Sequence, residues 1–122
     1  MSKEPLKLLT ESMFYVLLSL LRQDRCGAEI VQFVDDETAG RVRLGPGTLY
    51  TILAKFQEEG LICEVEVRGR QRTYRLTERG AAVFRRELGR LRLCVADGER
   101  EDALARQALE GQGALPEGRA ET

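Results

Sequence analysis

The apolar residues of the chain fall into four stretches with helical spacing and one stretch that alternates. The first stretch runs from Met13 to Leu21 behind Thr10, a residue type that suits the N-cap of a helix. This stretch is apolar on nearly every face, and a helix of that kind is buried on every face. Because so short a chain can hardly cover such a helix alone, we expect a partner subunit to cover part of it.

A second helix is expected over residues 27–38, followed by a short extended piece over residues 41–44. A third helix begins at the turn formed by residues 45–48, where Pro46 suits the first helical position because its missing N–H needs no partner there. The apolar residues of this helix recur at i, i+3, i+4 and i+7 and form one stripe: Leu49, Ile52, Leu53 and Phe56. Small and polar residues occupy the opposite face, and Gly60 ends the helix.

A β-hairpin is predicted next, with strands over residues 62–68 and 73–77 and a tip at residues 69–72. The alternation in the first strand places one set of side chains on a single side: Ile62, Glu64, Glu66 and Arg68. The tip and its flanks carry arginines with no acid between them: Arg68, Arg70, Arg72 and Arg75. A guanidinium offers phosphate several donors at once, so this basic tip indicates an anionic partner.

A fourth helix is expected after Thr77, which can act as its cap. Its apolar positions are spaced alternately by three and four residues, which predicts packing against another helix along its length: Ala81, Phe84, Leu88, Leu91 and Val95. Gly98 interrupts this pattern, which makes the last helix short, and residues 101–110 are expected to be helical again. Residues 111–122 contain mainly Gly, Pro, Ala and acid, a composition typical of a disordered tail.

The order of these elements is that of a winged helix-turn-helix domain. The predicted fold class is mostly α with a small β-hairpin: a winged-helix DNA-binding domain over residues 8–77, and a C-terminal dimerisation helix region over residues 78–110. In this architecture the third helix enters the major groove of DNA, and the hairpin tip, or wing, touches the neighbouring phosphate backbone.

Two sets of functional residues follow from this assignment. The residues expected to contact DNA lie on the third helix and the wing: Gly47, Thr48, Tyr50, Thr51, Lys55, Arg68, Arg70, Gln71 and Arg72. The residues expected at a homodimer interface lie on the first and last helices: Phe14, Leu17, Leu18, Leu21, Phe84, Leu88, Leu91 and Val95. Thr and Tyr read base edges less strictly than bidentate Arg or Asn, so we expect moderate sequence selectivity.

The net charge of −1 conceals a segregation of charge along the chain. Residues 41–92 carry a net charge of +6 between a start of −3 and an end of −4, which favours a local anionic partner such as duplex DNA. No apolar run is long enough to cross a bilayer, and the N-terminus lacks the pattern of a signal peptide. A cytoplasmic location is therefore expected.

Catalytic and metal chemistry have little support in the sequence. The chain has no His, and its three cysteines lie more than thirty positions apart, so neither an enzyme nor a bound metal or cofactor is expected. Two alternatives stay open beside DNA binding. The winged helix could serve protein contact without DNA, or Cys94, next to Val95 in the apolar stripe, could be an oxidation-sensitive thiol that regulates DNA binding.

Several strings resemble the PadR family of bacterial winged-helix regulators. Residues 9–18 resemble the family's first helix, and residues 45–62 resemble its recognition helix and the turn that follows. The most specific strings are Gly45-Pro46-Gly47-Thr48-Leu49-Tyr50 and Tyr74-x-Leu76-Thr77-x-x-Gly80. The resemblance covers roughly residues 8–95.

This resemblance implies a homodimer held by the first and last helices, DNA binding by the third helix and wing, and usually repression. Some members of the family respond to a small aromatic effector, either a phenolic acid or a drug-like compound. The chain has Cys26-Gly27-Ala28-Glu29-Ile30 where the family often has His-Gly-Tyr-Glu-Ile, and it has no Trp. These two differences concern the effector more than the fold.

Overall fold

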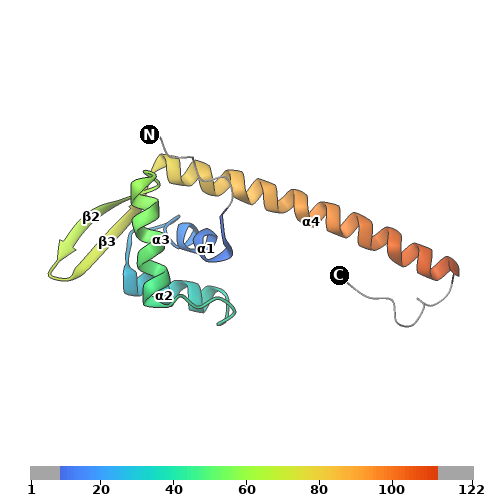
Figure 1. Cartoon of the computed structure of the whole chain (residues 1–122), viewed down its shortest axis with the longest axis horizontal. Helices are drawn as coiled ribbons and strands as arrows, with labels where there is room; N and C mark the ends of the chain where they lie inside the picture. The colour runs from blue at the N-terminus through green and yellow to red at the C-terminus, as the bar shows by residue number, and fades with distance from the viewer. Residues whose placement is uncertain (1–8, 113–122) are drawn as a thin grey trace. The chain divides into compact units, whose positions relative to one another are not determined.

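The computed structural model describes residues 9–112, whose helices and longer strands are labelled in Figure 1, and it divides into two compact units. The first unit ends at Glu87 and the second begins at Leu88, and each is described by itself. The elements in chain order are α1 (Glu11–Ser19), β1 (Arg25–Cys26), α2 (Gly27–Glu37), α3 (Pro46–Glu58), β2 (Ile62–Arg68), β3 (Gln71–Leu76) and α4 (Glu78–Gln112). This order confirms the predicted winged helix-turn-helix arrangement.

Helix α1 begins as predicted, since Thr10 Oγ1 accepts a hydrogen bond from the Met13 backbone N–H over 3.1 Å. It ends at Ser19, two residues before the predicted end. The ring of Phe14 stacks on that of Phe84, with 5.0 Å between the ring centroids. The largest fully buried side chains of the first unit come from all of its helices except α4 and from the turn after α3: Phe56, Leu17, Ile30, Leu53, Leu61, Val16, Val34 and Ser19.

The sheet has one more strand than the sequence predicts. Within residues 9–112 its order is β1-β3-β2, and both neighbouring pairs are antiparallel. The two residues of β1, Arg25 and Cys26, pair with Tyr74 and Thr73, so the polar turn expected here ends in a short edge strand. The structure therefore corrects the predicted two-stranded hairpin to a three-stranded sheet.

Strand β1 leads directly into α2, and Glu29 secures the junction. Glu29 Oε1 accepts a hydrogen bond from the Cys26 backbone N–H over 2.8 Å, which satisfies a donor that the first turn of a helix leaves unpaired. This bond, together with one from the Cys26 side chain, holds the pKa of Glu29 below its ordinary value.

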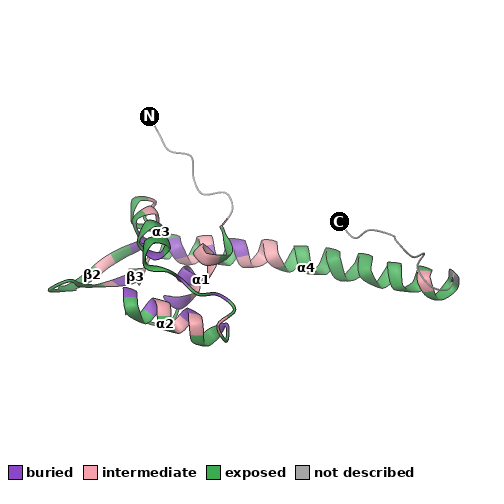
Figure 2. Cartoon of the chain, turned by 60° about the horizontal axis from the view of Figure 1, so that its bottom comes forward, coloured by how far each residue is buried: buried purple, intermediate pink, exposed green. Residues whose placement is uncertain are grey.

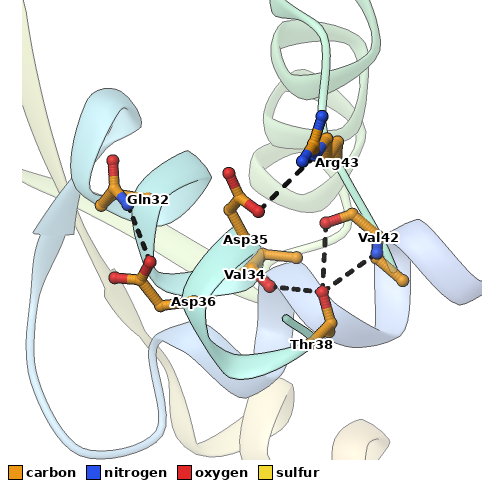
Figure 3. A network of polar contacts seen from close by, with 7 residues as sticks. All are labelled: Gln32, Val34, Asp35, Asp36, Thr38, Val42 and Arg43. Atoms are coloured by element: carbon orange, nitrogen blue, oxygen red, sulfur yellow. Dashed lines mark hydrogen bonds and ion pairs between the residues drawn. The ribbon is translucent and has the colours of Figure 1, made fainter. Parts of the chain in front are cut away.

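The connection from α2 to α3 is a loop fixed by Thr38 (Figure 3), and the extended piece expected over residues 41–44 is not a strand. Thr38 Oγ1 donates to the Val34 carbonyl over 2.8 Å and accepts from the Val42 backbone N–H over 3.0 Å. Arg43 Nε lies 3.6 Å from Asp35 Oδ1 and adds an ion pair across the same loop. These contacts fix the angle at which the chain enters α3.

The end of α3 is tied to the start of α4. Gly60 has φ +76°, a left-handed conformation that ends a helix, and the Leu61 backbone N–H returns to the Phe56 carbonyl over 2.8 Å. Thr77 Oγ1 donates to the Gly60 carbonyl over 2.7 Å and accepts from the Gly80 backbone N–H over 3.0 Å. Thr77 therefore caps α4, as predicted, and also joins it to α3.

Gly80 has no room for a side chain. A Cβ atom built on it would lie 2.1 Å from the Leu61 carbonyl oxygen and 2.7 Å from Leu76 Cδ1. The first turn of α4 can rest on the backbone after α3 only because this residue has no Cβ. The glycine in the Tyr-x-Leu-Thr-x-x-Gly string is thus explained by close packing between backbones.

Helix α4 continues through Gly98 to Gln112, so the prediction of an interrupted, short last helix is wrong. One glycine costs a helix about 1 kcal/mol relative to alanine, and the good helix formers on both sides outweigh that cost. Its second half is exposed from Arg92 to Ala108, in contrast with the buried parts of the first unit (Figure 2). The tail predicted over residues 111–122 begins too early, because residues 111–112 belong to α4, and residues 113–122 lie outside the described residues.

Candidate nucleic-acid interface

Helix α3 presents one buried and one exposed face, as its spacing predicts. Gly45 is the N-cap and Pro46 occupies the first turn, while the apolar stripe from Leu49 to Phe56 is buried. The predicted contact residues on its N-terminal half are all exposed: Gly47, Thr48, Tyr50 and Thr51. Tyr50 is the most prominent large side chain, with 59% of its surface exposed. A surface of small and hydroxyl-bearing residues suits close approach to base edges.

Lys55 is less available than the sequence suggests. Its ammonium lies 3.7 Å from the Glu59 carboxylate, and its side chain is only 40% exposed. It also lies in the last turn of α3, beyond the exposed N-terminal residues. Lys55 is therefore at the margin of this surface.

A β-bulge changes which side chains share a face of the wing. Glu64 pairs with Tyr74, whereas Glu66 pairs with Thr73, so the register shifts at Val65. Thr73 and Tyr74 are neighbours on β3 and therefore point to opposite sides of the sheet. Their cross-strand partners, Glu66 and Glu64, lie on opposite faces for the same reason. The prediction that they share a side is wrong, because an alternating pattern contains no sign of an inserted residue.

Three of the four wing arginines are already paired with acids. Arg68 Nε lies 2.6 Å from Glu66 Oε2, and Arg72 Nη1 lies 2.5 Å from Glu64 Oε2. On the far strand Arg75 donates two hydrogen bonds to Asp24, over 3.1 and 2.9 Å. The hydrogen bond to Glu64 raises the pKa of Arg72, and that to Asp24 raises the pKa of Arg75.

The positive field of the wing is therefore weaker than its count of arginines implies. Arg70, in the turn between the strands, has no acidic partner among residues 9–112. Gln71 is exposed, and its amide donates to Cys26 Sγ over 3.4 Å. Among the predicted wing contacts, Arg70 is thus the residue whose charge is most available.

A hollow of about 450 Å³ lies between the exposed face of α3 and the wing, and residues of both line it. We call it the wing hollow; its lining residues are Tyr50, Leu53, Ala54, Gln57, Arg70, Arg72 and Tyr74. Burial, with a smaller contribution from Glu64, raises the pKa of Tyr74, which stays a neutral phenol at physiological pH. The hollow joins predicted contact residues of α3 and of the wing into one surface.

Gln57 belongs to this surface and was missed by sequence reasoning. It lies three residues after Ala54 and seven after Tyr50, a spacing that places the three on one stripe of α3. That spacing was available in the sequence. In the sequence we looked instead for residues directly opposite the apolar stripe, and Gln57 lies to one side of that position.

The predicted interface residues on α1 and early α4 differ in exposure. Leu17 is 0% exposed and Phe84 is 5% exposed within the single chain. The core of their own subunit already surrounds both side chains, and their contribution to a dimer stays a prediction. Leu21 is exposed, while Phe14 and Leu18 are half-buried.

The second unit carries an apolar groove of about 320 Å³ along α4. It contains the three remaining predicted interface residues, and its full lining is Leu88, Leu91, Arg92, Val95, Ala96 and Glu99. Val95 is 57% exposed there. Cys94 is also exposed, and Arg90 Nη1 lies 3.7 Å from its sulfur, so its role as a thiol sensor stays a prediction.

The sequence profile of the "Transcriptional regulator PadR-like family" matches residues 16–86, more than half of the chain. The chain belongs to this family. The PadR-like match lies within the first unit and includes α2, α3 and the whole wing. No curated protein sequence is significantly similar to the chain.

Solved structures share the PadR-like fold. A transcriptional regulator from Clostridium thermocellum is 22% identical, with a TM-score of 0.66, over 72% of this chain and 89% of that one. RosR from H. salinarum is 24% identical, with a TM-score of 0.62, over 89% and 98%. Bacillus subtilis PadR, solved in complex with operator DNA, is 21% identical, with a TM-score of 0.56, over 62% of this chain and 46% of that longer one.

Residues 9–112 contain no group of three or more His, Cys, Asp or Glu side chains that could hold a metal ion. In the same part of the chain, no helix combines the length and the apolar character that crossing a membrane requires.

Proposed function

We propose that this PadR-like chain is a homodimeric repressor that binds duplex DNA, with α3 in the major groove and the wing on the phosphate backbone. The observation that carries the proposal is the continuous surface formed by the exposed face of α3 and the wing hollow. The operator DNA bound by the related B. subtilis PadR supports the same choice of partner.

Base recognition is assigned to the exposed face of α3. Gly47, Thr51 and Ala54 are small, so they let the helix backbone approach the floor of the groove. Tyr50 and Thr48 then supply hydroxyl groups and an aromatic edge, which tolerate several base arrangements. The expected result is moderate selectivity at each half-site.

Affinity is assigned mainly to phosphate contacts by the wing. Arg70 meets the backbone without first losing an acidic partner, whereas Arg68 must share its charge with Glu66. Contacts of this kind release counterions, so affinity falls as salt rises.

Dimerisation is assigned to the groove on α4, with a second copy as its occupant. Two charges at the groove, Arg92 and Glu99, have opposite signs and lie on either side of Val95. An antiparallel pairing centred near Val95 places Arg92 of one copy beside Glu99 of the other, whereas a parallel pairing opposes like charges. A two-fold dimer of this kind predicts an operator with two half-sites related by a two-fold axis.

The test is selection from a randomised duplex library by the purified protein, followed by fluorescence anisotropy on the selected and scrambled sequences. The proposal predicts enrichment of a sequence with two-fold symmetry and tighter binding to it than to the scrambled duplex. Failure to enrich any sequence, with weak and salt-insensitive binding, would favour a winged helix that contacts proteins.

The small aromatic effector stays a prediction, tested by whether phenolic acids release the DNA.

A further inference from the structure

Glu64 and Arg72 form an ion pair on the face of the wing that adjoins the wing hollow. The two residues come from neighbouring strands, and Arg72 lines the hollow together with Tyr74, the cross-strand partner of Glu64. The side chain of Glu64 is 23% exposed and that of Arg72 is 56% exposed. The carboxylate is therefore the more covered partner, and the guanidinium is the one presented to solvent.

The bulge at Val65 moves Glu66 away from Arg72 and leaves Glu64 as the carboxylate on the face of Arg72. In a regular strand that kept the pairing of Glu64 with Tyr74, Glu66 would lie on the same face and opposite Arg72, whereas the observed register pairs Glu66 with Thr73 on the other face. Bulges commonly redirect a side chain at a functional site. Glu66 pairs with Arg68 on the other face, away from Tyr74.

An arginine held by one acid can still bind a second anion. A guanidinium has five N–H donors. Among the described residues, Arg72 donates to the Glu64 carboxylate through Nη1, so its other nitrogen atoms keep donors for a second anion. Fixing the group in advance reduces the conformational freedom that phosphate binding would otherwise remove. The acid also repels a phosphate, but repulsion between exposed charges is screened by salt, and a hydrogen bond between charged groups is stronger.

We propose that Glu64 is a positioning residue for DNA binding. It holds Arg72 in the wing hollow so that the guanidinium meets a phosphate of the strand that passes between α3 and the wing. This inference rests on the proposed DNA binding. It gives a supporting role to an acidic residue that a simple count of charges would treat as unfavourable for DNA binding.

The test compares Glu64→Ala with the wild type by fluorescence anisotropy on the duplex selected by the wild-type protein, at several salt concentrations. Loss of a positioned arginine predicts binding about tenfold weaker, as for one charged hydrogen bond. It also predicts that the slope of the logarithm of the binding constant against the logarithm of the salt concentration, the salt slope, becomes shallower by about one, as for one lost phosphate contact. If Glu64 acted only through its charge, the same change would strengthen binding.

Two further variants serve as controls. Glu64→Gln keeps an acceptor oxygen near Arg72, so it is expected to retain affinity within about twofold of the wild type, since a neutral acceptor preserves the hydrogen bond. Glu66→Ala removes the same charge from the opposite face, and it is expected to bind as tightly as the wild type or tighter. In an Arg72→Ala background, Glu64→Ala should add no further loss.

Tighter binding by Glu64→Ala, or a loss that adds fully to that of Arg72→Ala, would overturn the positioning role. Circular dichroism melts show whether Glu64→Ala is folded. If it is not, Glu64→Gln with tighter binding than the wild type overturns the proposal on its own. A wild-type protein that binds no duplex at any salt would instead overturn the proposed function, and this role with it.

Discussion

The first unit buries its apolar side chains within itself, whereas the second leaves them exposed. Val16, Leu17 and Phe56 have 0% exposure, while Leu93 and Val95 in the second unit are 68% and 57% exposed. A single helix cannot cover its own apolar stripe, so its stability in water depends on what packs against it. The comparison shows that one unit has its own core, whereas the other leaves an apolar stripe uncovered, and a second copy is the partner that we propose for that stripe.

Gly80→Ala is expected to have the largest effect, and it acts on the core of the first unit. The new methyl group would meet the Leu61 carbonyl at 2.1 Å, so either α4 or the turn after α3 must shift. The expected loss is about 4 kcal/mol of unfolding free energy, near the upper end for single substitutions. Urea unfolding followed by circular dichroism measures it.

Gly89→Ala and Gly98→Ala are the matched controls, since a Cβ on either residue has no neighbour within 4 Å. Both are expected to stabilise α4 by up to about 1 kcal/mol, the ordinary gain from glycine to alanine in a helix. A Gly80→Ala protein as stable as the wild type would contradict the close packing at Leu61.

Val95→Asp is expected to break the dimer without unfolding the first unit. A charge in the apolar groove must be desolvated when a second copy binds, which weakens association about 100-fold. Sedimentation equilibrium measures the association, and thermal unfolding of the isolated monomer checks the fold.

Leu93→Asp provides the control, because Leu93 is at least as exposed as Val95 and does not line the groove. It should leave the dimer intact. Dissociation by Leu93→Asp, with Val95→Asp still dimeric, would place the interface on the other side of α4.

Arg70→Ala combined with Arg72→Ala is expected to weaken binding to every duplex and to reduce the salt slope by about two, as for two lost phosphate contacts. Anisotropy titrations at several salt concentrations measure the slope. Tyr50→Ala, by contrast, should lower the preference for the selected duplex over scrambled DNA. An unchanged slope in the double variant would remove the wing from the interface.

Glu29→Gln is expected to have the smallest effect, and the effect depends on pH. The folded pKa of Glu29 lies below its ordinary value, so its stabilisation is present above the ordinary carboxyl pKa and is lost as pH falls through the lowered one. The stability gap between wild type and variant should thus be widest near neutral pH and close in acid. Urea midpoints across pH measure the gap, and a gap that widens in acid would contradict the assignment.

Much of the fold could be predicted from local signals in the sequence. Thr10 and Thr77 cap their helices as expected, and the turn before Pro46 sets the start of α3. These features depend on neighbouring residues only, so spacing and residue type were sufficient.

The features that were missed depend on contacts between distant residues. Strand β1 has two residues, too few for any period, and exists because Tyr74 and Thr73 lie beside it. The bulge at Val65 leaves no trace in the alternation, and so it could not be foreseen that Glu64, and not Glu66, pairs with Arg72. The wing also appeared more basic in the sequence than it is in the folded chain, because the sequence alone does not show which acids pair with its arginines.

The burial of Leu17 was missed because an apolar helix does not reveal which of its faces its own subunit covers. Helix α1 is apolar all round, and the structure assigns Leu17 to the core and leaves Leu21 exposed. Only the packing of the other helices of the first unit separates these two residues.

The most direct test of the account is fluorescence anisotropy of the wild-type protein on the DNA upstream of its own gene and on scrambled duplex, at two salt concentrations, with the stoichiometry determined at saturation. The account predicts tighter binding to the upstream DNA at both salts, an affinity that falls with salt, and two copies per operator. Equal, weak and salt-insensitive binding to both duplexes would contradict it.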